Sequence, residues 1–414
     1  MLKLRSTPTT LMLAAAVAIG PLALDLYLPA MPAIGEALGV GADKVQLTLS
    51  VYVLGFALAQ ILVGPLSDRY GRKPVLVGGL LLFTGASVLA TFAQSIETLL
   101  LARLLQAVGG AAPPVLGRAA VRDIYGPLEA ARILAYMGLI FSLAPALAPI
   151  IGGQLLIFFD WPSNFAALAV YGGALALLLF TSLPETLAPE HRQSIAPTEI
   201  LRNYRTLCGN RLYLGYTLIN AAGFAAMFAF ISGSSFVLIE FLGIPAHHYG
   251  YYFMLGVFGF MVGSFIAGRN TRRLGIDRLL LLAGLLTAGG GALMLTFALG
   301  GDYSALTVVG PQVIIMIGAG IIAPQAMAGL MGPFPHMAGS ASALAGFLQM
   351  VIAALAGSAV GFWHDGTPLS MAAVSCVAGC SALLLYLGVV QPVRRAQQRR
   401  AANQPPAGQV VKSC

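Results

Sequence analysis

The sequence contains few charged residues. Asp, Glu, Lys and Arg together make up only 9% of its 414 residues, whereas 58% are hydrophobic. A soluble globular domain carries about 25% charged residues. A composition this poor in charge excludes a soluble globule and indicates that lipid, rather than water, surrounds most of the chain.

Other chemistry is scarce as well. The sequence has no Gly-x4-Gly-Lys-Ser/Thr loop to hold nucleotide phosphates, and none of its five histidines falls inside a long apolar run. A membrane-embedded enzyme needs clustered nucleophiles, bases or metal ligands, and no such cluster is found. No basic run is interleaved with aromatic residues, which argues against nucleic acid as a partner. We therefore expect no enzyme activity, no metal site and no cofactor.

Long hydrophobic runs, by contrast, are abundant. Apolar windows of about 20 residues, the length that crosses a bilayer as a helix, fall into two sets of six. We expect twelve transmembrane helices, near 11–34, 46–66, 74–94, 98–120, 132–158, 164–183, 212–235, 249–268, 278–299, 304–331, 339–361 and 369–391. The expected fold class is all-α, with two pseudo-symmetric six-helix halves at 1–183 and 212–393.

The remaining segments are polar. We expect 184–211 to be a cytoplasmic linker with a short amphipathic helix near 197–208. The tail at 394–414 is rich in Gln, Pro and Arg and has no apolar periodicity, so we expect it to be disordered. The first apolar run is too long for a cleaved signal peptide and is interrupted by Asp25, so we interpret it as helix 1.

Positive charge is confined to one side of the predicted bundle. All but two of the 23 Lys and Arg residues fall in segments on the same side as the N-terminus, the exceptions being Lys44 and Arg103. Lys and Arg are retained in the cytoplasm. We therefore expect a multi-pass membrane protein with both termini in the cytoplasm.

A short basic turn between two apolar runs occurs twice. The first copy runs from Gly64 to Pro74 (GPLSDRYGRKP), and an altered copy runs from Gly268 to Gly275 (GRNTRRLG) half a chain later. A turn repeated at this spacing predicts a duplicated helical bundle.

In its amino-acid sequence and its position, the first copy resembles the loop between helices 2 and 3 of the major facilitator superfamily. Two further motifs extend the resemblance. Residues 101–110 (LARLLQAVGG) are similar to the superfamily's helix-4 motif, and residues 144–153 (APALAPIIGG) are similar to its exporter-specific helix-5 motif, with alanine at two usual glycine positions. The resemblance implies export by alternating access.

A narrower resemblance joins both halves. The runs 25–32 (DLYLPAMP), 48–57 (TLSVYVLGFA), 183–187 (LPETL) and 334–346 (FPHMAGSASALAG) look like the bicyclomycin and chloramphenicol resistance subfamily of bacterial drug:proton antiporters. This resemblance implies a place in the bacterial inner membrane, with small amphipathic compounds, protons and the lipid bilayer as partners. It also implies that the proton gradient supplies the energy, and we expect a monomer.

The resemblance assigns gating to the first basic turn and to helix 5. It implies that Asp68 and Arg72 form a latch, in which the Asp68 carboxylate docks on the positive N-terminus of helix 11 and favours an outward-open state. A solvated turn that only sets topology is the alternative. Small residues in helix 5 should allow close contact with helix 8. The gating residues are Gly64, Asp68, Arg69, Gly71, Arg72, Pro149, Gly152 and Gly153.

Two charged residues lie inside the predicted spans. Asp25 is the only acid well inside any of them, and there desolvation favours its protonated form while a nearby Arg103 favours the ionised form. Arg103 lies about five residues, or 7 to 8 Å at 1.5 Å per residue, inside the outer end of helix 4. We expect the two to pair, directly or through water, and to couple transport to protons. A structural acid and an arginine that snorkels to the surface are the alternatives.

A set of aromatic, Met and amide side chains is predicted to face the substrate. Such a lining suits amphipathic molecules of varied structure. We expect a proton-driven antiporter that exports small amphipathic drugs; a proton-coupled carrier of a metabolite such as an amino acid is the alternative, although it would need more buried charges. The candidates are Tyr52, Gln60, Tyr136, Asn220, Phe224, Met227, Phe228, Phe230, Gln325 and Gln349.

Overall fold

A computed structural model describes residues 7–187, 197–334 and 337–402 of the chain. Within these ranges the chain is helical apart from short turns and contains no strand. The all-α fold class predicted from the composition is therefore confirmed.

The first half contains seven α-helices and a short 3-10 helix. Its first predicted span is broken, because Pro29 and Pro32 have no N–H groups with which to continue the hydrogen-bond ladder. Helix α1 therefore ends at Asp25, in the middle of the span. The elements are α1 (Thr7–Asp25), η1 (Leu28–Ala30), α2 (Met31–Leu38), α3 (Ala42–Tyr70), α4 (Arg72–Thr91), α5 (Ile96–Gly110), α6 (Ala112–Phe158) and α7 (Pro162–Ser182).

The second half follows an amphipathic helix, α8 (Pro197–Cys208), at the position predicted for it. Two short π-helices, η3 and η5, extend the first and last helices of this half. Its elements are α9 (Arg211–Ser235), η3 (Phe236–Phe241), α10 (Ala246–Gly300), α11 (Ala305–Met331), α12 (Ala338–Phe362), α13 (Leu369–Leu385), η5 (Tyr386–Val390) and α14 (Gln391–Ala402).

These helices are consistent with twelve membrane crossings. Ten helices in the described ranges are long and apolar enough to span a bilayer, and one of them, the 55-residue α10, covers two predicted spans. A shorter apolar stretch at Leu143–Phe158, within α6, supplies the fifth crossing. The prediction of two six-helix sets is confirmed.

The repeated basic turn is also repeated in the backbone. Gly71 has φ 101° and ψ 156°, and its counterpart Gly275 has φ 73° and ψ 168°. Side chains are strained at positive φ, so glycine is needed at both positions. Each of these glycines separates two successive helical segments, and the two halves are therefore built on the same plan.

Two boundaries differ from the predictions. A loop was expected between 120 and 132, but α6 is helical through all of its 47 residues. The tail was expected to be disordered from residue 394, but α14 carries it as a helix to Ala402. Residues 403–414 lie outside the described part of the chain.

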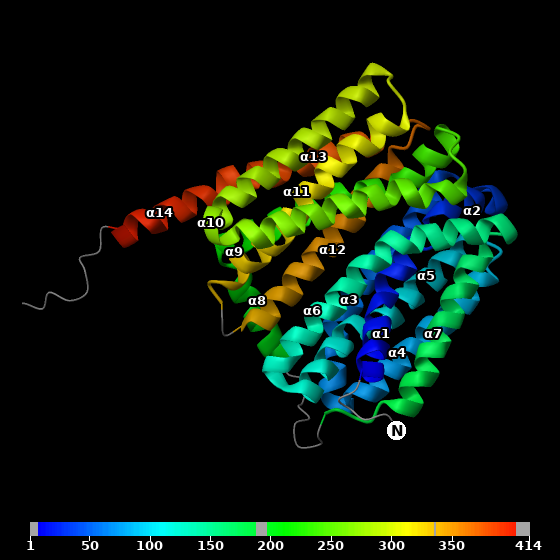
Figure 1. The fold of residues 1–414 in the computed structure, drawn as a ribbon, viewed down its shortest axis with the longest axis horizontal. Coiled ribbons are helices and arrows are strands. Elements are labelled where there is room, and N and C mark those ends of the chain that lie inside the picture. Colours follow the sequence, from blue (N-terminus) through cyan, green and yellow to red (C-terminus); the bar gives the residue numbers. More distant parts are fainter. Residues whose placement is uncertain (1–6, 188–196, 335–336, 403–414) are drawn as a thin grey trace, which may run out of the picture.

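Figure 1 shows α1 to α7 as one group of helices and α9 to α13 as a second group. The groups meet near α2 and diverge toward the N-terminus and α14. We call the end that carries the Tyr70–Arg72 turn the basic end, and the end that carries the α2–α3 turn the opposite end. Two helix pairs, α3 with α12 and α6 with α10, make the most extensive contacts between the halves.

Helices α10 and α11 pack through glycines. A side chain at Gly263 would overlap the carbonyl oxygen of Ile317, and one at Gly320 would overlap that of Phe260. Small residues bring helix backbones close together in membranes, where van der Waals contact rather than the hydrophobic effect joins helices.

Replacing Gly263 with alanine should therefore destabilise the second half by about 1–3 kcal/mol, because the added methyl group overpacks a backbone contact. Gly268→Ala, five residues along the same helix, is the matched control, since a Cβ there meets nothing within 4 Å. Apparent melting temperatures of the purified proteins in detergent would measure the effect. Equal melting of the two variants would contradict this account of the packing.

Candidate functional site

Arg103 forms the centre of the first half. It lies in α5 and is fully buried, with 0% of its surface exposed. Its Nη1 donates to the carbonyl oxygen of Ala23 at 2.9 Å and to Oε1 of Gln106. The guanidinium carbon lies 4.4 Å from the ring centre of Tyr27 and 4.2 Å from that of Tyr52. Cation–π contact of this kind stabilises a cation most where water is excluded.

The partners of Arg103 are themselves held in place. Gln106 donates from Nε2 to Oγ of Ser87 at 2.8 Å, and Ser87 donates to the carbonyl of Phe83 at 2.7 Å. The Tyr27 hydroxyl is 2.9 Å from Oγ1 of Thr48. The guanidinium is thus fixed by α1, α3 and α5 together, and it does not snorkel to the surface.

The Asp25 carboxyl lies close to this cluster, at the last residue of α1. It is 3% exposed, and its Oδ1 has no hydrogen-bond partner among the described residues. The Arg103 Nε and Nη2 atoms also have no partner there, so of the pairing that we expected, directly or through water, the direct form is absent.

Arg72 organises the first basic turn. Its Nη1 lies 2.6 Å from Oδ1 of Asp68, and its Nε donates to Oδ2 of Asp123 at 3.4 Å. The Glu185 carboxylate accepts from the backbone N–H groups of Arg72 at 2.9 Å and Lys73 at 3.2 Å. Glu185 therefore caps the N-terminus of α4, where a negative charge is favoured.

The predicted latch is not formed in this structure. Asp68 forms its ion pair with Arg72 of its own half. Within the described residues nothing joins Asp68 to α12, which is the predicted helix 11. Arg69 lies over the ring of Tyr70, at 5.3 Å from its centre. A Cβ added to Gly64 would meet nothing within 4 Å, so this predicted gating residue makes no close helix contact here.

The opposite end is where α6 and α10 close together. A Cβ at Gly153 would lie 2.8 Å from the carbonyl oxygen of Ala246, and one at Gly250 would lie 2.5 Å from the backbone nitrogen of Ile150. A Cβ at Gly152 would overlap the carbonyl of Leu26, and Pro149 is buried nearby. Helix 5 of the prediction is the second part of α6, and helix 8 is the first part of α10. The close contact predicted between them is thus observed.

A second contact joins the halves at the same end. Ser232 of α9 donates to Oε1 of Gln46 in α3 at 3.4 Å. A Cβ at Gly361 of α12 would lie 3.0 Å from the same Gln46 oxygen. The opposite end is therefore closed by backbone packing and by a buried polar contact.

Some of the predicted substrate-facing residues are brought together. Asn220 of α9 donates from Nδ2 to Oε1 of Gln349 in α12 at 2.5 Å. Phe224 stacks on Phe228, with ring centres 6.2 Å apart. Phe224, Gln349, Met227 and Gln60 are half-buried, so they keep exposed surface that a ligand can contact.

Other candidates serve packing instead. Tyr52 is 2% exposed beneath Arg103 and donates to the carbonyl of Gly20 at 3.3 Å. Phe228 and Phe230 are almost fully buried, and Gln325 donates to Oγ1 of Thr271 at 2.7 Å inside the second half. The Tyr136 side chain lies outside the described part of the structure.

Several residues of the site were missed in the sequence. The position of Gln106, one helical turn after Arg103, was a usable signal, since residues three apart share a helix face. Tyr27 stands two residues after Asp25 within a motif already noted. Gln46 and Ser232 had no local signal, because they meet across the two halves.

The chain is similar to known transporters over most of its length. Residues 13–358 match the family described as Major Facilitator Superfamily. A bicyclomycin resistance protein homolog from Haemophilus influenzae is 32% identical over 82% of this chain and 85% of its own length. Multidrug resistance protein D from Escherichia coli is 32% identical, covering 84% and 86%. A chloramphenicol resistance protein from Pseudomonas aeruginosa is 30% identical, covering 81% and 79%.

A solved structure agrees with the fold. The crystal structure of a peptide transporter superposes with a TM-score of 0.73 at 14% identity, covering 94% of this chain and 95% of the other. At that identity the likeness concerns the fold alone. With the family match and the drug-resistance relatives, these findings lead to one conclusion: the chain belongs to the major facilitator superfamily of membrane transporters, and its resemblance is to the bicyclomycin and chloramphenicol resistance proteins.

Proposed function

We propose that this transporter exports small amphipathic compounds from the cytoplasm in exchange for protons, by alternating access. The observation that carries the proposal is the buried Asp25 carboxyl beside the buried Arg103 guanidinium, at a break in α1. A carboxyl excluded from bulk water at such a depth can bind and release a proton as its surroundings change. The names of the relatives support drugs as the cargo.

The distribution of charge supports the direction. The basic end carries Arg69, Arg72, Lys73 and the arginines around α10 and α14, which is the pattern of a cytoplasmic face. With the basic end in the cytoplasm, closure at the opposite end makes this conformation inward-facing. Compounds in the cytoplasm would then reach the half-buried residues of α3, α9 and α12.

The break in α1 offers a link between protonation and closure. Leu26, next to Asp25, packs through its carbonyl on Gly152 of α6. Met31, just beyond η1, accepts a hydrogen bond at its sulfur from Ser235 of the second half at 3.5 Å. A proton that binds or leaves Asp25 would therefore act on the segment that closes the opposite end.

The basic turn would hold the alternative state. In an outward-facing conformation the basic end closes, and Asp68 would dock on the N-terminus of α12. The Asp68–Arg72 pair is a weak obstacle to this exchange, because the Asp68 carboxylate is 43% exposed and solvent screens its attraction to Arg72, which is 14% exposed.

Accumulation of chloramphenicol and of bicyclomycin in intact cells tests the function. Cells that make the protein should accumulate less of at least one compound than cells without it, and an uncoupler should abolish the difference because it removes the proton gradient. A difference that survives the uncoupler would rule out proton coupling. No difference for either compound, with export of an amino acid instead, would favour the metabolite carrier.

Asp25→Asn should abolish uphill export while expression stays normal, because the amide keeps the shape of the carboxyl but releases no proton. The variant should still exchange labelled substrate on one side of the membrane for unlabelled substrate on the other, since this exchange requires no net proton movement. Asp302→Asn, which changes an exposed acid at the opposite end, is the control and should transport as the wild type does. Undiminished uphill export by Asp25→Asn would refute the role of Asp25.

Asp68→Asn should leave substrate affinity unchanged and slow turnover, because the neutral amide stabilises the closed basic end less than a carboxylate does. Spin labels on cysteines replacing Arg122 and Arg272, both exposed at the basic end, would report the separation of the halves. We expect the population with short distances to fall in Asp68→Asn and to recover in Asp68→Glu. Identical distance distributions in all three proteins would exclude the latch.

A further inference from the structure

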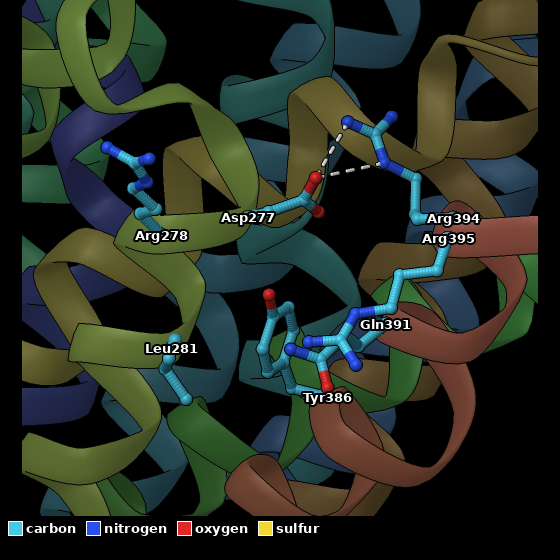
Figure 2. A pocket seen from close by; sticks show the side chains of 7 residues that line it. All are labelled: Asp277, Arg278, Leu281, Tyr386, Gln391, Arg394 and Arg395. Carbon is cyan, nitrogen blue, oxygen red and sulfur yellow. Dashed lines mark hydrogen bonds and ion pairs between the residues drawn. The ribbon is translucent and has the colours of Figure 1, made fainter. Parts of the chain in front are cut away.

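A pocket of about 210 Å³ lies at the basic end of the second half, away from the site described above. It is formed where the second span of α10 begins, after Gly275, and where η5 leads into α14 (Figure 2). The pocket is smaller than the roughly 300 Å³ at which sites for drug-sized ligands begin. Its lining residues are Asp277, Arg278, Leu281, Tyr386, Gln391, Arg394 and Arg395.

The pocket carries excess positive charge. Arg394 donates from Nη2 to Oδ2 of Asp277 at 3.1 Å and from Nε at 3.3 Å, so one arginine is neutralised. Arg278 and Arg395 are exposed and have no ion pair among the described residues. Figure 2 shows Arg395 reaching toward Tyr386 and Gln391, whereas Arg278 lies beyond Asp277 with its guanidinium turned away from the other labelled side chains. One uncompensated guanidinium, that of Arg395, therefore lies at a small concave site, and Arg278 adds positive charge at its edge. Guanidinium matches phosphate in geometry.

The first half differs at the equivalent place. There the carboxylate that follows the last helix, Glu185, caps the segment that begins after Gly71. In the second half the residue that reaches the segment after Gly275 is Arg394 of α14, a cation, which pairs with Asp277. The last segment of the first half thus places an anion at this turn, whereas the last segment of the second half places cations there.

The surroundings of the pocket are apolar and exposed. Leu282 and Leu285 continue along α10 from Arg278 and are 40% and 53% exposed. Leu384 and Leu387, on α13 and η5, are 66% and 39% exposed. Since α10 and α13 pack together, these side chains border one lipid-facing surface that leads from the pocket toward the membrane interior. A soluble anion has no apolar part to contact such a surface, whereas the acyl chains of a lipid would pack against it.

We propose that this pocket binds an anionic phospholipid of the surrounding membrane. Its phosphate interacts with Arg395, Arg278 adds positive charge at the edge of the pocket, and its acyl chains lie against the exposed leucines of α10 and α13. Basic pockets between helices on the cytoplasmic side favour anionic head groups. Gln391 provides a polar side chain at the rim, and the Asp277–Arg394 pair holds the two helices that form the site.

The test compares two double variants of the full-length protein in detergent. Arg278→Gln with Arg395→Gln removes two charges from the pocket; Arg272→Gln with Arg273→Gln removes two exposed charges nearby on the same face. Native mass spectrometry with phosphatidylglycerol measures lipid binding, and phosphatidylcholine and inorganic phosphate are the comparison probes. The pocket variant should bind phosphatidylglycerol about 30-fold more weakly, since each basic residue near a membrane surface attracts anionic lipid about fivefold. The control variant should bind as the wild type does.

The outcomes separate the sources of the anion. Equal weakening in both variants would overturn the proposal, because it would show attraction to the basic face as a whole. Binding of phosphatidylcholine as strong as that of phosphatidylglycerol would also overturn it, as would displacement of the lipid by millimolar inorganic phosphate. If the double variant does not fold, Arg395→Gln and Arg395→Lys are compared instead; the lysine variant should retain most of the binding and the glutamine variant should lose it.

Discussion

The burial of the Arg103 guanidinium is the constraint on which the first half depends. A cation inside the membrane is costly unless polar groups and aromatic rings surround it. Here the break in α1 supplies one of those groups. Because Pro29 ends the helical ladder, the carbonyl of Ala23 lies in the last turn, where helix carbonyls lack partners within the helix. Arg103 donates to that carbonyl, and a cation is favoured at a helix C-terminus. The prolines after Asp25 and the arginine in α5 thus stabilise one another's positions.

The same break places the site next to the moving parts of the transporter. The segment after Asp25 packs on Gly152, and Gly153 packs on α10 of the other half. Glycine backbones make these contacts, so they are tight when closed and leave no side chains to rearrange when they separate. At the basic end the corresponding groups are charged and exposed, and they can exchange partners at small cost. The opposite end therefore suits closure by tight backbone packing, and the basic end suits closure by charged groups that exchange partners.

Much of this fold could be predicted from the sequence, because helices that cross a membrane appear in it as long apolar runs separated by polar segments. The spans, the α8 helix and the repeated turn follow from composition and from glycine at positive φ. Contacts that are not local could not be predicted in this way. Asp25 and Arg103 were expected to pair, directly or through water, because their depths agree; the structure shows no direct contact, and Tyr27 and Tyr52 pack against the guanidinium. Gln325 was predicted to face the substrate, yet it turns toward Thr271 within its own half. Depth along a helix is readable from sequence, whereas the direction of a side chain is not.

The two halves share a backbone plan and divide the chemistry between them. Gly71 and Gly275 adopt the same unusual conformation, but Glu185 meets the first turn and Arg394 the second. Likewise the buried acid and arginine belong to the first half, while the amide pair of Asn220 and Gln349 belongs to the second. A proton site in one half can affect a substrate site in the other only through contacts that cross between them. Ser232 with Gln46 and Ser235 with Met31 make such contacts, and both lie at the end that is closed. In the function proposed above, coupling of the two sites would therefore pass through the opening and closing of that end, as alternating access requires.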